Sequence, residues 1–282
     1  MTGRRAVEWL APETLDEAVA LRAERGEDST VVAGGSFLGI LMNQGFVQPT
    51  SLLSLRRVAA LRGIVVGDGE LRLGAMTTHR DVERDETVRQ GWPVLARAFG
   101  VVASPRVRNQ ATVGGVLADA DYASDPPTAL TALDARAVLR SARGNREVPI
   151  DELILGYYET CIADDELLTE VRVPAAPDRA VYRKFRSRSV EDRPCVAVAA
   201  TRTGGELRVV VGACAEKPQR YPDICAAARG ETIDRELAQE IGRRYAERLQ
   251  PLSDSRGGAE YRRRVVAVEV RRAIEELAGP ER

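Results

Sequence analysis

The chain has 282 residues, of which 44% are hydrophobic and 29% charged, with a formal net charge of −1 and a pI near 6.1. This composition is that of an ordinary globular protein of one to three domains, and it lacks the positive field that attracts nucleic acid or an anionic membrane surface. No apolar run approaches the roughly eighteen residues of a membrane span, so we expect neither nucleic-acid binding nor a membrane segment.

Cysteine usage argues against a metal site. Cys161, Cys195, Cys214 and Cys225 stand far apart, without a C-x-x-C pair, and this spacing does not suit a zinc or iron–sulfur site. The first eight residues hold two arginines but no apolar stretch behind them, unlike a secretory signal. We therefore expect a cytoplasmic protein with reduced, mostly buried thiols and no bound metal.

Residues 1–60 predict a small α/β subdomain. Thr14 and Glu17 have the spacing of a capping box, which favours a helix that starts at this point and stops at Gly26. The apolar pattern then predicts a strand over residues 30–33, a helix over 37–42 and a second strand over 52–55.

Residues 61–174 predict a second subdomain. The turn Gly67-Asp68-Gly69 between two apolar runs indicates a β-hairpin. Thr78 is expected to cap a helix together with Asp81, and the neighbouring His79, the single histidine, is expected to be structural. The remaining elements are expected as helices over 93–99 and 128–133 and as strands over 137–139 and 167–173.

A linker at residues 174–177 leads to a third unit over residues 178–282. Gly204-Gly205 separates apolar runs at 195–200 and 207–213, which predicts a second hairpin. Two helices are expected to follow, over about residues 234–249 and 258–277.

Two glycine-rich turns are the most informative feature. Ala33-Gly34-Gly35-Ser36 follows the first strand, and Ala111-Thr112-Val113-Gly114-Gly115 follows a segment at 101–103 that we expect to be extended. Paired glycines let the backbone approach a ligand closely, and their N–H groups can surround an anion. Each turn alone is equally compatible with an ordinary turn, but two with adjacent hydroxyl residues suggest a ligand with two phosphates, such as a dinucleotide. Neither turn matches a P-loop or a Rossmann fingerprint.

Longer motifs extend along the chain. They include VVAGGS at 31–36, SPRVRNQATVGGVLADADYASDPPTALTALDA at 104–135 and YRKFRSRSVEDRPCVAVAA at 182–200. With these motifs the chain resembles, over nearly its whole length, the FAD-binding medium subunit, or domain, of molybdenum hydroxylases, the group of carbon monoxide dehydrogenase and xanthine dehydrogenase. The resemblance implies an α+β architecture: a vanillyl-alcohol-oxidase (PCMH)-type FAD-binding fold of two α/β subdomains, then a C-terminal domain with a three-stranded sheet and a helical bundle.

The resemblance also implies cofactor-binding residues, and none that acts catalytically on a substrate. Ala33, Gly34, Gly35 and Ser36 would hold the pyrophosphate of FAD from one side, and Thr112, Gly114 and Gly115 from the other. Asp125 falls where the family's carboxylate bonds a ribityl or ribose hydroxyl, Leu167 or Leu168 would pack on the flavin ring, and Lys184 falls where the family has a basic residue near the isoalloxazine.

Two of these residues have alternative interpretations, and two neighbouring positions depart from the family pattern. Asp125 precedes two prolines and is also placed to cap a helix, and Lys184 is also compatible with the surface of a basic strand. The family often has Asn where Val116 stands, and many relatives are polar where Phe37 stands. Both departures make the pocket more apolar.

The expected function is that of an FAD-carrying electron-transfer subunit. A molybdopterin-binding large subunit would oxidise the substrate, and a 2Fe-2S small subunit would pass electrons to this chain and on to an acceptor. The absence of clustered cysteines fits this division of labour. The alternative is a stand-alone FAD-dependent enzyme that acts on a small organic substrate, which Phe37 and Val116 mildly favour. A third possibility is a member that has lost FAD and serves in assembly.

Overall fold

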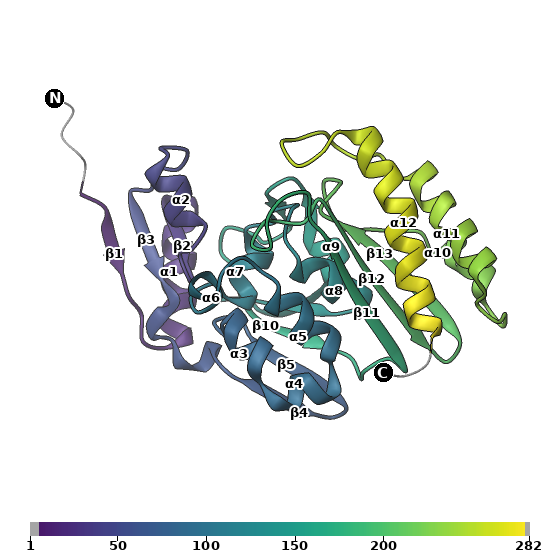
Figure 1. The fold of residues 1–282 in the computed structure, drawn as a ribbon. Helices are drawn as coiled ribbons and strands as arrows, with labels where there is room; N and C mark the ends of the chain where they lie inside the picture. Colours follow the sequence, from purple (N-terminus) through teal and green to yellow (C-terminus); the bar gives the residue numbers. More distant parts are fainter. Residues whose placement is uncertain (1–5, 280–282) are drawn as a thin grey trace.

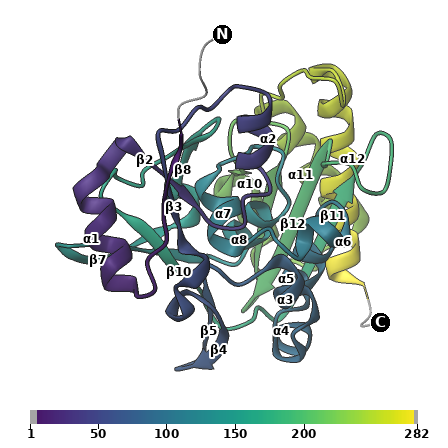
Figure 2. The same cartoon turned by 90° about the vertical axis from the view of Figure 1, so that its left-hand side faces the viewer.

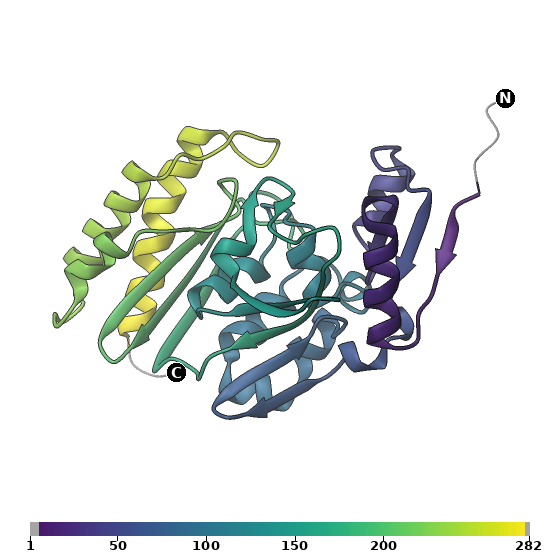
Figure 3. The ribbon, with the colours of Figure 1, turned by 180° about the vertical axis from the view of Figure 1, so that it is seen from behind.

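The computed structural model describes residues 6–279, which form three units side by side, in chain order (Figure 1, Figure 3). Arg4 and Arg5, on which the expectation about export partly rested, lie outside the described residues. Between residues 6 and 279, no helix has both the length and the apolar character needed to cross a membrane.

The N-terminal unit is a parallel sheet with strand order β1-β3-β2. Thr14 and Glu17 form the predicted capping box, and Gly26 ends the helix at φ 49°, as expected. In Figure 2 the N-terminal unit stands in front of the middle unit. Strand β2 forms one edge of the N-terminal sheet. Its elements are β1 (Glu8–Leu10), α1 (Leu15–Arg25), β2 (Ser29–Val32), α2 (Leu38–Asn43) and β3 (Ser51–Ser54).

The middle unit is built on an antiparallel sheet with strand order β4-β5-β10-β6-β7. The predicted hairpin joins β4 and β5, and the positive φ angles of Asp68 and Gly69 are those of a primed turn. Its strands are β4 (Ile64–Gly67), β5 (Glu70–Gly74), β6 (Arg136–Ser141), β7 (Gly144–Pro149) and β10 (Leu167–Val173), with β8 (Ile154–Gly156) and β9 (Glu159–Thr160) as a separate pair.

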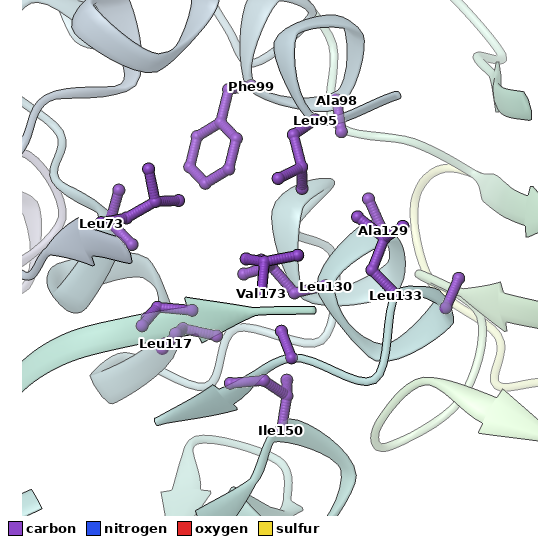
Figure 4. Packing of buried hydrophobic residues seen from close by; sticks show 14 of the residues in the cluster. Leu73, Leu95, Ala98, Phe99, Leu117, Ala129, Leu130, Leu133, Ile150 and Val173 are labelled. Atoms are coloured by element: carbon purple, nitrogen blue, oxygen red, sulfur yellow. The ribbon is translucent and has the colours of Figure 1, made fainter. Parts of the chain in front are cut away.

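Helices pack on this sheet around a core that includes Leu73, Leu95, Phe99 and Val173 (Figure 4). The cap formed by Thr78 and Asp81 is confirmed. The helices are α3 (His79–Arg84), α4 (Glu86–Gly91), α5 (Pro93–Gly100), α6 (Pro105–Arg108), α7 (Val113–Ala118), α8 (Pro126–Ala132) and α9 (Ile150–Leu153).

The expectation of an extended segment at residues 101–103 is wrong. The amide of Val101 bonds the carbonyl of Arg97 and so caps α5, and Ala103 has a φ of 39°. Pro105 then begins α6, so the second glycine turn follows a short helix rather than a strand.

The C-terminal unit is an antiparallel sheet, order β11-β12-β13-β14, that is buried on both faces. Along β12, Ala197 and Ala199 pack on the middle unit, whereas Val196 and Val198 pack on the C-terminal helices, as the alternation of a strand requires. The implied three-stranded sheet therefore gains a fourth, two-residue strand. The elements are β11 (Arg179–Phe185), β12 (Val196–Thr203), β13 (Glu206–Gly212), β14 (Gln219–Arg220), α10 (Pro222–Cys225), α11 (Arg235–Arg248) and α12 (Ala259–Ala278).

Candidate functional site

A cavity of about 800 Å³ is lined by residues of all three units, a size at which proteins bind small molecules and cofactors. It is bounded by β2 and the first glycine turn, by α7, by the segment 160–168 and by the residues around Lys184. Every residue that the sequence analysis singled out for cofactor binding lines it: Ala33, Gly34, Gly35, Ser36, Thr112, Gly114, Gly115, Asp125, Leu167, Leu168 and Lys184.

The first glycine turn presents free backbone donors. Among the described residues, the N–H groups of residues 34–37 have no hydrogen-bond partner, and Gly35 takes a φ of 70° that suits glycine. Gly34 has a different requirement, because a Cβ there would lie 1.9 Å from the carbonyl oxygen of Gln110. The glycine thus lets this turn touch the segment before the second one. The turn has the unpaired amides that an anion requires.

The second glycine turn is occupied by its own hydrogen bonds. The amides of Val113 and Gly114 donate to the carbonyls of Thr77 (2.9 Å) and Ala75 (2.8 Å), and the amide of Gly115 donates to the Thr112 hydroxyl (3.1 Å). The interpretation of both turns as amide-lined anion sites is therefore wrong for this one. The Thr112 oxygen accepts this bond, and the hydroxyl keeps its own proton to donate to another group.

The glycines of the second turn are explained by packing. A Cβ on Gly114 would lie 2.7 Å from the Cβ of Ala75, and one on Gly115 would lie 2.9 Å from the Thr112 hydroxyl oxygen and 3.6 Å from the Cβ of Ala33. These contacts bring the start of α7 against β5 and against the first turn. The two turns therefore meet at one point of the cavity wall.

Asp125 and Lys184 form a buried ion pair in the lining of the cavity. The Lys184 ammonium donates to Asp125 Oδ2 and to the Val101 carbonyl, both at 2.8 Å, and each charged side chain is 4% exposed. The Tyr182 hydroxyl donates to Asp125 Oδ1 at 2.7 Å. Burial raises the pKa of the Asp125 carboxyl against the pull of Lys184, and it lowers the pKa of the Lys184 ammonium.

These contacts exclude both alternative interpretations of the pair. The Asp125 side chain makes no capping bond to α8, and Lys184 is buried rather than on the surface. Sequence reasoning missed Tyr182, although Tyr182 and Lys184 stand two residues apart on β11 and so point to the same face. That spacing was the available signal.

The departures from the family pattern lie at the cavity wall. Phe37 stacks on Tyr158 with ring centroids 6.0 Å apart, and the Arg193 guanidinium lies 5.4 Å from the Phe37 centroid. Arg193 also bonds Asp121 at 2.7 Å. Val116 lines the cavity from α7 and packs on the middle core. Phe37 and Val116 thus spend part of their apolar surface on contacts with other side chains of the protein and not only on the cavity.

Asp119 and Asp121 add carboxylates that sequence reasoning did not single out. Both line the cavity, and burial, followed by the charge of Asp121, raises the pKa of Asp119 to about 7. Their signal was the acidic D-x-D spacing directly after α7.

His79 holds the second turn in place, as its expected structural role requires. Its backbone amide donates to the Ala111 carbonyl at 2.9 Å, its Nε2 lies 3.2 Å from the Thr112 carbonyl, and its ring packs edge-on against Phe99. Since a carbonyl can only accept, Nε2 carries the proton. Nδ1 has no partner among the described residues.

This burial predicts an acid-sensitive fold. Desolvation lowers the pKa of His79 from 6.5 to about 4, so the unfolded chain binds the proton more tightly. The neutral, buried His79 makes its full contribution to the free energy of unfolding above about pH 6.5. That contribution, about 3 kcal/mol, is lost as the pH falls to about 4. His79→Gln keeps a donor and cannot titrate, so urea unfolding at a series of pH values should show a shallower loss in that window. Equal losses in both proteins would contradict the assignment.

Comparisons with known protein sequences identify the family of this chain. Residues 5–176 match the family described as "FAD binding domain in molybdopterin dehydrogenase", and residues 180–277 match the "CO dehydrogenase flavoprotein C-terminal domain". The chain belongs to this family. It is similar to the nicotine 6-hydroxylase medium subunit of Paenarthrobacter nicotinovorans, with 32% identity over 97% of this chain and 98% of the relative.

Comparison with solved structures supports the same family assignment. A carbon monoxide dehydrogenase chain from Hydrogenophaga pseudoflava superposes with a TM-score of 0.91 at 32% identity, covering 96% of each chain. A chain of quinoline 2-oxidoreductase from Pseudomonas putida 86 gives 0.91 at 30% identity, covering 97% of each. The resemblance and the α+β PCMH-like fold with its C-terminal domain are confirmed. The chain is an FAD-binding flavoprotein subunit of molybdenum hydroxylase complexes.

Proposed function

We propose that this chain holds FAD across the cavity and passes electrons from a 2Fe-2S small subunit to an external acceptor, while a molybdopterin-binding large subunit oxidises the substrate. The observation that carries the proposal is the convergence of the singled-out residues on one cavity, where the first turn offers unpaired amides. The relatives named above as a medium subunit and as carbon monoxide dehydrogenase support the assembly.

The residues present fit the cofactor. The amides of residues 34–37 would hold the pyrophosphate from one side and the Thr112 hydroxyl from the other. Asp125 has two bonded oxygens and spare lone pairs, so it can accept from a ribityl or ribose hydroxyl as well. Leu168 supplies an apolar surface for the ring. FAD supplies the redox chemistry, and the Lys184 charge favours its reduced form.

We expect the purified chain, denatured and analysed by chromatography, to release about one FAD per chain. Purification from the native host should also bring down a molybdenum subunit and an iron–sulfur subunit. Steady oxidation of a small organic substrate by the isolated chain would instead support the stand-alone enzyme. A colourless protein that does not bind added FAD would contradict the proposal and favour a role in assembly.

A further inference from the structure

The segment that joins α5 to α6 is held by a single arginine. Val102 and Ala103 line the cavity, whereas Arg108 is not among the lining residues. Nη1 of Arg108 donates to the carbonyls of Val102 and Ala103, both at 2.9 Å. The carbonyl of Val101, the residue before them, instead accepts from the Lys184 ammonium at 2.8 Å. Three successive carbonyls are therefore divided between two cationic side chains.

The guanidinium of Arg108 is itself fixed in direction. Its side chain is 9% exposed, and its Nε donates to Glu83, on α3, at 2.9 Å. Nη1 of Arg80 bonds both oxygens of the same carboxylate, also at 2.9 Å. A guanidinium presents its donors in a rigid fork, so the bond to Glu83 also sets the direction in which Nη1 of Arg108 points. The Glu83–Arg108 contact thus connects α3 to the segment between α5 and α6.

Arg108 holds this segment in a conformation that is uncommon for its residues. Ala103 has a φ of 39°, in the left-handed region that residues other than glycine seldom adopt. Such angles persist where the surrounding contacts overdetermine them, and here those contacts include the two bonds from Arg108. Without these bonds the segment can relax at Ala103, and the Val101 carbonyl loses its fixed direction.

The position of the Lys184 ammonium depends on that carbonyl. The ammonium donates to Asp125 Oδ2 and to the Val101 carbonyl at equal distances of 2.8 Å, and the Lys184 side chain is 4% exposed. When the carbonyl is released, Asp125 is the partner that remains, so the ion pair closes. The field of a charge falls at a distance when its counter-ion lies closer, because the two contributions cancel more completely.

We propose that Arg108 is a positioning residue for Lys184. It keeps the Val101 carbonyl directed at the ammonium and so fixes the charge that acts on the flavin. The inference rests on the proposed function, which places FAD in the cavity that Lys184 lines. Arg108 then tunes the reduction potential of the flavin through Lys184, without lining the cavity itself.

The test measures the reduction potential of FAD bound to the full chain, by spectroelectrochemical titration of Arg108→Met, Arg108→Lys and Arg80→Met. Arg80→Met is the matched control. Like Arg108→Met it removes one positive charge from Glu83, but it leaves the bonds to Val102 and Ala103 in place. Arg108→Lys keeps the charge beside Glu83 and is the variant expected to stay folded, which urea unfolding checks.

Both Arg108 variants should lower the potential. Methionine has no donor, and a single lysine ammonium cannot span Glu83 and two carbonyls as the forked guanidinium does. At a fixed applied potential, the ratio of reduced to oxidised flavin should fall about tenfold, which is a shift of about 30 mV for a two-electron couple. Arg80→Met should keep the wild-type potential.

The same titrations in the Lys184→Met background separate positioning from a direct effect. With no ammonium to position, Arg108→Met should cause no further shift, whereas an effect of the Arg108 charge itself, or of a loosened fold, would persist. The proposal is overturned if the shift is equal in both backgrounds, or if either Arg108 variant keeps or raises the wild-type potential.

Two further outcomes separate this inference from the proposed function. If Lys184→Met binds FAD at the wild-type potential, the lysine does not act on the flavin, and the role of Arg108 is overturned while the FAD site stands. A wild-type chain that binds no FAD would contradict the proposed function, and this inference with it.

Discussion

Gly34→Ala should weaken FAD binding by about a hundredfold. The new Cβ would lie 1.9 Å from the Gln110 carbonyl oxygen and 2.7 Å from its carbon, both of them backbone atoms that no rotamer change can move away. The two turns must therefore separate, and overpacking of this kind costs about 1–3 kcal/mol. If FAD binds only when the two turns have their native spacing, binding must push the turns together again and bring back the clash. A cost near 3 kcal/mol corresponds to about a hundredfold in the dissociation constant.

Gly39→Ala is the matched control for this prediction. Gly39 lies in α2, where a Cβ would have no atom within 4 Å and the φ angle is not positive, and alanine favours a helix over glycine by about 0.5–1 kcal/mol. Urea unfolding should show a loss of stability for Gly34→Ala and none for Gly39→Ala. FAD titration should separate the two variants in the same way. Wild-type FAD affinity in Gly34→Ala would show that the contact between the turns does not shape the site.

The local features of the fold could be predicted from the sequence, and the reasons for individual glycines could not. The capping box at Thr14 and the hairpin at Asp68 depend on residues a few positions apart, so the local sequence is enough to predict both. Gly34 is a glycine because of Gln110, which is distant in sequence and close only in the folded chain. Its chemistry predicts a ligand contact, which stays a prediction, and the structure adds a contact between two loops that no local pattern contains.

Contacts between distant parts of the sequence also explain why the second turn was not predicted correctly. Its amides are satisfied by Ala75 and Thr77, whose proximity follows from the packing of α7 on β5 and from no pattern within the turn itself. Tyr182 was within reach of sequence reasoning, because strand alternation places it on the face of Lys184. Its bond to Asp125 was not, since that contact joins two units of the chain.

The Asp125–Lys184 pair should produce opposite shifts in the reduction potential of bound FAD. Lys184→Met removes a positive charge that favours the reduced form and should lower the potential, whereas Asp125→Asn leaves the ammonium uncompensated and should raise it. For a two-electron couple, about 1.4 kcal/mol corresponds to about 30 mV, so shifts of tens of millivolts are expected. Lys217→Met is the control, because Lys217 is the other lysine of the chain and bonds the Asp151 carbonyl outside the cavity.

Both single variants should also lose about 3 kcal/mol of stability, because removing one partner of a buried ion pair leaves the other charge without compensation. The double variant should recover much of that loss, which a double-mutant cycle by urea unfolding measures. In Lys184→Met, the lysine charge no longer opposes burial, and only the Tyr182 hydrogen bond and the more distant Arg186 still do, so the folded pKa of Asp125 stays above the unfolded value. Its deficit should therefore shrink as the pH falls and the carboxyl takes up a proton.

Stability and potential together separate two roles of the pair. A purely structural pair would change the unfolding free energy in both variants and leave the potential unchanged, or shift it in one direction through general loosening of the site. Opposite shifts require the two charges to act on the cofactor electrostatically, with the signs that Coulomb's law gives them. Spectroelectrochemical titration of the two single variants decides this, because the wild type fixes the reference and each variant removes one sign of charge from the same buried contact.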